Sequence, residues 1–472
     1  MATHLGFLLL FSLLLVNAYS QSCTNYPDTA STKCNCTEGL SRSSFPPGFQ
    51  FGAGSAAYQI GWQMVIMEMW PLMHTIDTRA EFEHYVDVCF SRFGDRVKNW
   101  ITLNEPWTFA AYGYDSGSMA PGRCSEWMDL NCTGGDSGTE PYNVTHNLIL
   151  SHLAAVRRYW RYYKPRQEGR IGITLVAQWY EPCNVSNGDA EAADRQMSFF
   201  LGWYLGPIVN GVYPDDMIEH VGERLPTFTD EQTQELQHSF DFLGVNYYTA
   251  FYVNNTPSDP TKLSYTTDSQ ALTSGKFPIF PFAKFKLHIF SFHLTHFVIL
   301  PWLACCNDQR IAQPAGSSTW LNVYPIGLKK LLLHIRDTYG DLPMIITENG
   351  NRNDLKTWAS LPDDSSVEAS LNDTDRRDYI SDHLCCLHQS INEDGMDVSG
   401  YVAWSLTDNL EWCQGFTQRF GLNYVNVTEN NNFTRTPKLS AEWFTDFLRR
   451  EPEPSISLKA GDTIDSLYST SI

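Results

Sequence analysis

The sequence is poor in basic residues and lacks several patterns that mark particular classes of protein. Its 33 Lys and Arg residues are outnumbered by 53 Asp and Glu residues, for a net charge of -20. It therefore offers no positive stripe for a nucleic-acid backbone. No spacing of His and Cys resembles a zinc site, and no Gly-rich first turn of a doubly wound nucleotide-binding sheet is found. We expect neither a nucleic-acid partner nor a metal.

The N-terminal stretch has no charged residue. An apolar run from Leu5 to Val16 leads into small residues before Gln21. This run is too short to span a bilayer and has no basic flank. It therefore predicts a signal peptide over residues 1–20 and a mature chain that begins at Gln21, with no membrane anchor.

Eight potential glycosylation sites support a secretory route. Each has the form Asn-X-Ser/Thr without proline, which is the acceptor pattern of secreted proteins. No endoplasmic-reticulum retention signal closes the sequence, so we expect an extracellular or vacuolar protein. The eight sites are Asn35, Asn131, Asn143, Asn184, Asn254, Asn372, Asn426 and Asn432.

The 12 cysteines are an even number, which in an oxidising compartment indicates disulfides rather than metal ligands. Cys124 and Cys132 enclose a short loop and are the pair that we expect first. Spacing alone does not fix the other connections, which stay open. Cys413 is one candidate partner for the cysteines of the N-terminal segment 21–44, which are Cys23, Cys34 and Cys36.

Residues 45–450 are expected to form the main domain. Within it, helical and strand patterns alternate from Glu81 onward. Amphipathic helices are predicted over 83–93, 147–163, 190–208 with further turns after Asp230, 326–338 and 375–391. A β-rich run follows each helical stretch, and one further strand precedes them all. The six expected strands cover residues 49–52, 97–103, 171–177, 242–248, 344–348 and 398–404.

This alternation implies a parallel sheet with right-handed crossovers. Polar or aromatic residues stand at the C-terminal end of almost every strand, which favours a (β/α)8 TIM barrel over a doubly wound sheet. Only six strands are found where a barrel needs eight. The tail 451–472, with Pro452, Pro454 and many small polar residues, is expected to be a flexible end.

Two glutamates stand at the C-terminal ends of expected strands. Glu105 follows one expected strand and Glu348 closes another. Hydrolysis of a glycosidic bond needs one carboxylic acid to protonate the leaving oxygen and one carboxylate to attack or to activate water. Neighbouring strands of a barrel can bring such groups together. A single glutamate is more often a solvated loop residue. The sequence around the two glutamates therefore decides whether they form a catalytic pair.

That context resembles the family-one glycoside hydrolases, the plant β-glucosidases and myrosinases, from about Phe45 to Leu448. The paired signatures are Thr-Leu-Asn-Glu-Pro at 102–106 and Ile-Thr-Glu-Asn-Gly at 346–350. Other matching segments lie at 45–52, 55–59, 246–248 and 404–412.

The resemblance implies that Glu105 is the acid/base and Glu348 the nucleophile of a retaining β-glucosidase. It would act on the terminal β-D-glucosyl residues of O-glucosides without a cofactor. Asn104 should bind the sugar 2-hydroxyl, and Tyr248 should donate to Glu348 and keep it ionised. The other expected substrate-binding residues are Gln59, Trp404, Glu411, Trp412 and Phe420. Without the two acidic motifs, core packing would be the simpler role for the aromatics.

The residue at position 105 separates two chemistries. Myrosinases resemble this pattern but carry Gln there, because a thioglucoside leaving group needs no proton. Glu105 therefore favours O-glucosides. Cys413 and the cysteine-containing N-terminal segment resemble the myrosinase branch, so thioglucosides stay open as an alternative.

The chain departs from the family between Gln59 and Glu105. Relatives have roughly a hundred more residues there, which carry the second and third βα units of the barrel. The family's Glu after Gln59 is replaced by Ile60, and its His-Trp-Asp sugar-binding motif is absent. A non-catalytic remnant that only binds sugars is therefore a second alternative. A third is an error in the gene prediction that hides a complete enzyme.

A second irregular stretch runs from about 280 to 310. Its apolar bias is interrupted by His288, His293, His296 and Pro301, which argues against a membrane hairpin. A translated intron and a genuine loop insertion are both compatible with it. Whether the protein forms a homodimer is also left open by the sequence.

Overall fold

The computed structural model describes residues 31–36, 39–56, 77–184, 188–274, 320–352, 365–427 and 433–449. Several expectations from the sequence lie outside these described residues. They are the signal peptide 1–20, Gln59, the irregular stretch 280–310, Asn432 and the tail 451–472.

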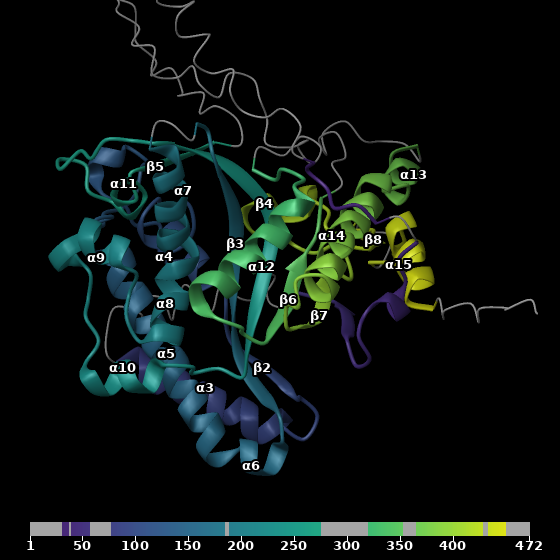
Figure 1. Cartoon of the computed structure of the whole chain (residues 1–472), viewed down its shortest axis with the longest axis horizontal. Helices are drawn as coiled ribbons and strands as arrows, with labels where there is room; N and C mark the ends of the chain where they lie inside the picture. The colour runs from purple at the N-terminus through teal and green to yellow at the C-terminus, as the bar shows by residue number, and fades with distance from the viewer. Residues whose placement is uncertain are drawn as a thin grey trace, which may run out of the picture.

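A seven-stranded sheet forms the centre of the molecule (Figure 1). Six of its strands are parallel and follow the order β1-β7-β6-β4-β3-β2. The seventh, β5 (Ala271–Ser274), pairs antiparallel with the end of β4. The parallel strands are β1 (Gln50–Ala53), β2 (Asn99–Asn104), β3 (Arg170–Pro182), β4 (Phe242–Asn255), β6 (Met344–Asn349) and β7 (Val398–Ala403).

All six strands expected from the sequence are therefore present, and their order is that of a barrel opened between β1 and β2. Within the described residues, these two strands end the sheet. The opening leaves apolar side chains exposed that a closed barrel would cover. Ile101 of β2 is 43% exposed, and Tyr85 and Val88 are also exposed on the helix that precedes β2. The fold is a (β/α) barrel with a gap.

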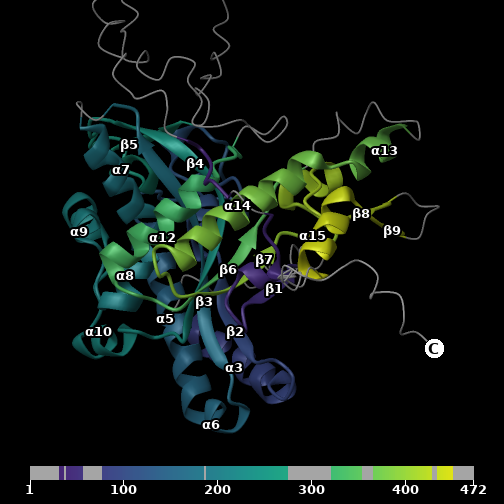
Figure 2. The same cartoon turned by 45° about the vertical axis from the view of Figure 1, so that its right-hand side comes forward.

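Helices cover the outside of the sheet (Figures 1 and 2). The longest are α3 (Asp77–Phe93), α5 (Glu140–Tyr162), α12 (Pro325–Tyr339) and α14 (Thr374–Asn392). Shorter helices and a hairpin fill the connections. They are α4 (Pro106–Tyr114), α6 (Lys164–Gln167), α7 (Asp189–Met197), α8 (Trp203–Asn210), α9 (Asp215–Val221), α10 (Asp230–Leu236), α11 (Tyr265–Asp268), α13 (Ser365–Leu371), α15 (Leu439–Arg449), β8 (Asn423–Val425) and β9 (Arg435–Pro437).

The sequence explains why these helices begin and end where they do. Pro141 and Pro325 stand in the first turns of α5 and α12, where a residue without an N–H loses no helical hydrogen bond. Gly340 follows α12 with a φ of 87°, a conformation that glycine adopts without a Cβ clash. Because β4 is covered on both faces, its first nine residues are all buried.

Three predicted helices differ from the observed ones. The helix expected over 83–93 already begins at Asp77. The helix expected at Asn147 already begins at Glu140, because Pro141 initiates it earlier than the apolar pattern shows. The single helix expected over 190–208 is divided into α7 and α8 by a π-helical turn over Ser198–Gly202. Phe199, Phe200 and Leu201 of this turn are all buried, so tertiary packing outweighs helical regularity there.

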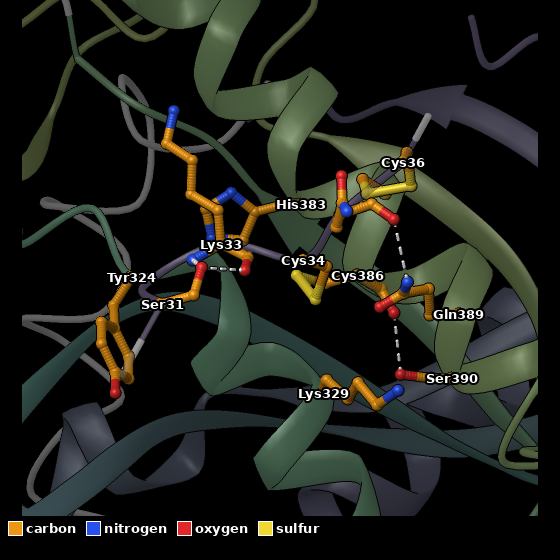
Figure 3. Close-up of a disulfide and its surroundings, with 12 residues drawn as sticks. Ser31, Lys33, Cys34, Cys36, Tyr324, Lys329, His383, Cys386, Gln389 and Ser390 are labelled. Carbon is orange, nitrogen blue, oxygen red and sulfur yellow. Dashed lines mark hydrogen bonds between the residues drawn. A yellow bond between two sulfur atoms is a disulfide. The ribbon is translucent and has the colours of Figure 1, made fainter. Parts of the chain in front are cut away.

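Two disulfides fasten the N-terminal segment to the middle of α14. Cys34 is bonded to Cys386, and Cys36 to Cys385. Figure 3 shows the first bond, with His383 of α14 beside the segment. The hypothesis that Cys34 and Cys36 pair with Cys413 is therefore wrong, because the segment crosses α14 where two adjacent cysteines are available.

The third disulfide is the short-loop pair expected from the sequence, between Cys124 and Cys132. Cys23 and the side chain of Cys413 lie outside the description. None of the described helices combines the length and the apolar character that a bilayer crossing requires.

Candidate active site

The C-terminal ends of the parallel strands meet at one edge of the sheet, as in any (β/α) barrel. Glu105 directly follows β2, Tyr248 lies in β4, Glu348 lies in β6 and Trp404 directly follows β7. Residues that are far apart in the sequence thus come together. Asn104 and Glu348, 244 positions apart, are joined by a hydrogen bond of 3.2 Å.

Glu105 has a left-handed backbone, with φ 50° and ψ 54°, at the junction of β2 and α4. This conformation is costly for a residue with a Cβ and is typical of functional sites. The Glu105 N–H donates to the carbonyl of Thr174 in β3. Its carboxylate accepts hydrogen bonds from Asn246 Nδ2 at 2.8 Å and from Thr108 Oγ1 at 3.1 Å. Backbone and side chain are therefore both held in place.

Glu348 is held by two donors. The phenol of Tyr248 donates to Oε2 at 2.5 Å, and Asn104 Nδ2 donates to Oε1 at 3.2 Å. Burial keeps the pKa of Tyr248 well above 10, so its hydroxyl stays protonated and donates. The hydrogen bond from Tyr248 to Glu348 that the sequence predicted is present.

Asn246 links the two glutamates. Besides donating to Glu105, its Nδ2 lies 3.2 Å from Asn104 Oδ1, and its own Oδ1 accepts from Thr347 Oγ1 at 2.7 Å. Asn246 lies in a segment that matches the family, but no role for it was expected from the sequence. One signal could have found it: Asn246 precedes Tyr248 by two residues on a strand, so both side chains project from the same face.

The two carboxyl groups influence each other. Burial raises the pKa of Glu105. Burial also raises the pKa of Glu348, to about 8, helped by the negative charge of Glu105 and opposed by Tyr248 and Asn104. Two buried carboxyls side by side do not both ionise easily, so the pair retains one proton near neutral pH. The short hydrogen bond from a phenol stabilises charge better than the longer one from Thr108, which places the charge on Glu348 and the proton on Glu105.

Trp404 is brought beside Asn349 and Gly350, which follow Glu348, by a close approach of two strand ends. The N–H of Trp404 donates to the carbonyl of Asn349. A Cβ at Gly350 would lie 2.0 Å from the Trp404 carbonyl oxygen. Only glycine fits there, which gives the glycine of the Ile-Thr-Glu-Asn-Gly signature a physical reason. The Trp404 side chain is half-buried.

The remaining expected sugar contacts lie in the loop after β7. Phe420 is buried, and its ring centroid is 6.3 Å from that of Tyr248. Glu411 is also buried, and within the described residues its Oε1 has no hydrogen-bond partner. Burial raises the pKa of Glu411 to about 7, while the Trp404 and Asn409 side chains lower it. Trp412 is 45% exposed, so it lies further out than the others.

A buried ion cluster supports this loop. Asp408 accepts hydrogen bonds of 2.8 Å from both Arg419 and Lys438. It also accepts from the N–H groups of Gly421 and Val425. The loop that carries Glu411 and Phe420 is therefore tied by a multiply paired carboxylate to Lys438, the residue directly before α15.

One exposed aromatic was missed in the sequence analysis. Trp320 is 40% exposed, and its ring meets that of Tyr248 edge-on at 6.1 Å. Trp320 directly follows residues that the structure does not describe, and no regular pattern in the sequence points to it. Across the described residues, no cluster of His, Cys, Asp or Glu could hold a metal ion.

The fold and the paired carboxyls define an open (β/α) barrel with two acidic groups at the C-terminal ends of its strands. The family profile of glycosyl hydrolase family 1 matches residues 70–452, and the chain belongs to this family. It is 42% identical to β-glucosidase 12 of rice, Oryza sativa subsp. indica, over 373 residues. That match covers 78% of this chain and 65% of the relative, so the chain spans about two thirds of the relative's length.

Solved structures agree in fold. A rice β-glucosidase superposes with a TM-score of 0.74 at 31% identity, covering 87% of this chain and all of the other. A β-glucosidase from the fungus Humicola insolens, in complex with glucose, gives a TM-score of 0.68 at 32% identity, covering 80% and 72% of the two chains.

Proposed function

We propose that this chain is a retaining β-glucosidase that hydrolyses terminal β-D-glucosyl residues of O-glucosides. One observation carries the proposal: Glu105 and Glu348 share one hydrogen-bond network through Asn104 and Asn246. The amide of Asn246 acts on both carboxyls, because it also lowers the pKa of Glu348. Carboxyls within reach of one amide favour the short separation of retaining enzymes, about 5 to 5.5 Å, over the wider spacing of inverting ones.

In the first step, Glu348 Oε attacks the anomeric carbon while the Glu105 proton passes to the leaving oxygen. The glycosidic bond breaks, the alcohol departs, and a glucosyl ester forms on Glu348. In the second step, Glu105 takes a proton from water, and the resulting hydroxide displaces Glu348 from the anomeric carbon. Glucose is released, and each glutamate regains its starting state. No cofactor takes part.

The rest of the site supports a sugar ligand. The buried Glu411 Oε1 lacks a partner within the described residues, and a buried unpaired acceptor is costly unless a ligand hydroxyl satisfies it. Trp404 and Phe420 supply apolar faces near Glu348, suited to the C–H surface of a glucose ring. Glu105 favours an oxygen leaving group, because sulfur would need no proton from it.

The test is glucose release from a chromogenic β-D-glucoside and from a glucosinolate by the secreted product of the full 472-residue sequence, beside Glu348→Gln. Turnover of the O-glucoside that disappears in the variant supports the proposal. Preferential turnover of the glucosinolate would indicate a thioglucosidase instead. A soluble, compact protein that binds glucose saturably but releases none would be a non-catalytic remnant. Transcript sequences across residues 59–105 and 280–310 would show whether the chain is naturally complete.

We also propose that the protein acts in the extracellular space or the vacuole. Three disulfides among the described residues suit an oxidising compartment. Four of the glycosylation sites have exposed side chains: Asn35, Asn131, Asn143 and Asn372. Asn184, Asn254 and Asn426 are half-buried. Mass analysis before and after enzymatic removal of N-glycans from the secreted protein tests the proposal; an unchanged mass contradicts it.

A further inference from the structure

A layer of buried polar groups adjoins Glu348 and the backbone of Tyr248 and takes no part in the proposed chemistry. Its centre is Asn349, the neighbour of Glu348, which is fully buried. Asn349 Nδ2 donates to the carbonyl of Tyr247 in β4 at 2.7 Å. Its Oδ1 accepts from the hydroxyl of Tyr401 in β7 at 2.8 Å. One amide thereby joins three adjacent strands.

Tyr379 of α14 completes the layer. Its hydroxyl donates to the carbonyl of Tyr248 at 2.9 Å and accepts from Asn349 Nδ2 at 3.2 Å. Only 1% of Tyr379 is exposed. Asn349 thus holds the Tyr247 carbonyl, and Tyr379 holds the Tyr248 carbonyl. The peptide units on both sides of the Tyr248 Cα are therefore fixed. The direction in which the Tyr248 side chain leaves its strand depends on both.

The helix that supplies Tyr379 is itself anchored. His383 stacks on Tyr379 at 3.9 Å between ring centroids. The two disulfides that follow join α14 to the N-terminal segment, and Lys33 of that segment forms an ion pair of 2.6 Å with Asp382. A helix held this firmly can position a strand backbone, because its own displacement is resisted by covalent bonds.

We infer that Tyr379 is a positioning residue, which acts through Asn349 and the Tyr248 backbone to hold the Tyr248 hydroxyl against Glu348. The hydroxyl of Tyr379 does not contact the carboxyls. It sets how well Tyr248 stabilises the charge on Glu348, and α14 transmits the rigidity of the disulfide-linked segment to that contact. The inference deepens the proposed function and rests on it only where turnover is measured.

The experiment compares Tyr379→Phe with Tyr204→Phe in the full chain. Tyr204 is an equally buried tyrosine whose hydroxyl pairs with Thr145 at 2.8 Å, in α8 and away from the two glutamates. The main readout is the pKa of Glu348, from an NMR titration of protein labelled with ¹³C at the glutamate carboxyls. The Glu348 resonance is assigned by its loss in Glu348→Gln. This readout needs no turnover.

Tyr379→Phe is expected to raise the pKa of Glu348 by about 0.5, the effect of weakening one hydrogen bond to a charged group. Tyr204→Phe should leave it unchanged. In a Tyr248→Phe background, Tyr379→Phe should cause no further rise, because its route of action is gone. If the chain turns over glucosides, the acidic limb of the kcat/KM profile should move by the same amount.

No rise in Tyr379→Phe, an equal rise in Tyr204→Phe, or an undiminished rise in the Tyr248→Phe background would each overturn the inference. If Tyr379→Phe does not fold, Tyr401→Phe weakens the same layer through Asn349 and should raise the pKa in the same direction. A chain that hydrolyses no glucoside but shows the expected titration would refute the proposed function and leave the positioning role intact. Normal glucoside hydrolysis without a shift in the pKa of Glu348 would support the proposed function and overturn the positioning role.

Discussion

The Tyr248 hydroxyl donates to Glu348 Oε2 across 2.5 Å, and even so burial and the charge of Glu105 raise the pKa of Glu348 to about 8. The strongest donor in the site therefore only partly offsets the cost of a buried charge. Because a carboxyl of this kind has an ordinary pKa of 4.5, the buried pair of Glu105 and Glu348 retains one proton that the unfolded chain releases between these two values.

Stability should consequently fall as the pH rises from about 4.5 to about 8, since the folded state binds more protons over that range. Glu348→Gln removes one of the two carboxyls, and with it the like-charge repulsion that contributes to this loss. We expect the variant to be more stable than the parent at pH 8, and the difference to shrink as the pH approaches 4.5. Thermal unfolding at both pH values measures it. Glu442→Gln, at an exposed position of α15, is the control; an advantage for Glu348→Gln that is independent of pH would contradict the linkage.

The loss of activity on removal of the proton donor should depend on the leaving group. Glu105→Gln keeps the side-chain shape but cannot supply a proton. We expect kcat/KM to fall by about 10² to 10⁴ for an alkyl glucoside, which leaves as a poor alkoxide. A dinitrophenyl glucoside leaves without protonation, so bond cleavage should be much less affected. Steady-state kinetics with both substrates measure the ratio, and equal losses for the two would argue against Glu105 as the proton donor.

The ion cluster behind the loop after β7 should be costly to break. Asp408→Asn leaves the buried Arg419 and Lys438 without their shared carboxylate. Breaking one side of a buried charge cluster typically lowers the free energy of unfolding by about 3 to 5 kcal/mol. Denaturant unfolding of the variant measures the loss. Asp95→Asn, at an exposed position, should be almost neutral; a similarly small effect for Asp408 would show that the cluster contributes little.

The two disulfides to α14 should be largely redundant. They close loops with sequence separations of 352 and 349 residues, and at each end their cysteines lie no more than two positions apart. Either bond alone already removes most of the loop entropy of the unfolded chain. Cys34→Ser/Cys386→Ser should therefore lower the midpoint of thermal unfolding only slightly, and so should Cys36→Ser/Cys385→Ser.

Removal of both bonds should cost more than the sum of the two single removals, with a total of about 2 to 5 kcal/mol. The matched comparison is the Cys124–Cys132 pair, with a separation of only 8 residues, whose loss acts independently. Strict additivity between the two long-range bonds would contradict the redundancy.

Much of the fold could be predicted from local patterns. The six parallel strands were found because each apolar run ends abruptly in polar residues, and the helices because their apolar residues recur with helical spacing. Predictions were poorer where tertiary packing outweighs local preference. The π-helical turn at Ser198–Gly202 interrupts a continuous apolar pattern, and the early start of α5 depends on Pro141 rather than on apolar spacing.

The sequence by itself determined which residues the proposed chemistry assigns a role: Glu105 and Glu348 stand at strand ends within family signatures, and Tyr248 follows from the resemblance. Only the tertiary structure decided how they are held. Asn246 between the two carboxyls, Tyr379 beneath them, and the pairing of Cys34 and Cys36 with α14 all join residues at least 100 positions apart. Such contacts depend on the order of strands in the sheet and on which helix crosses which segment, and no local periodicity encodes these.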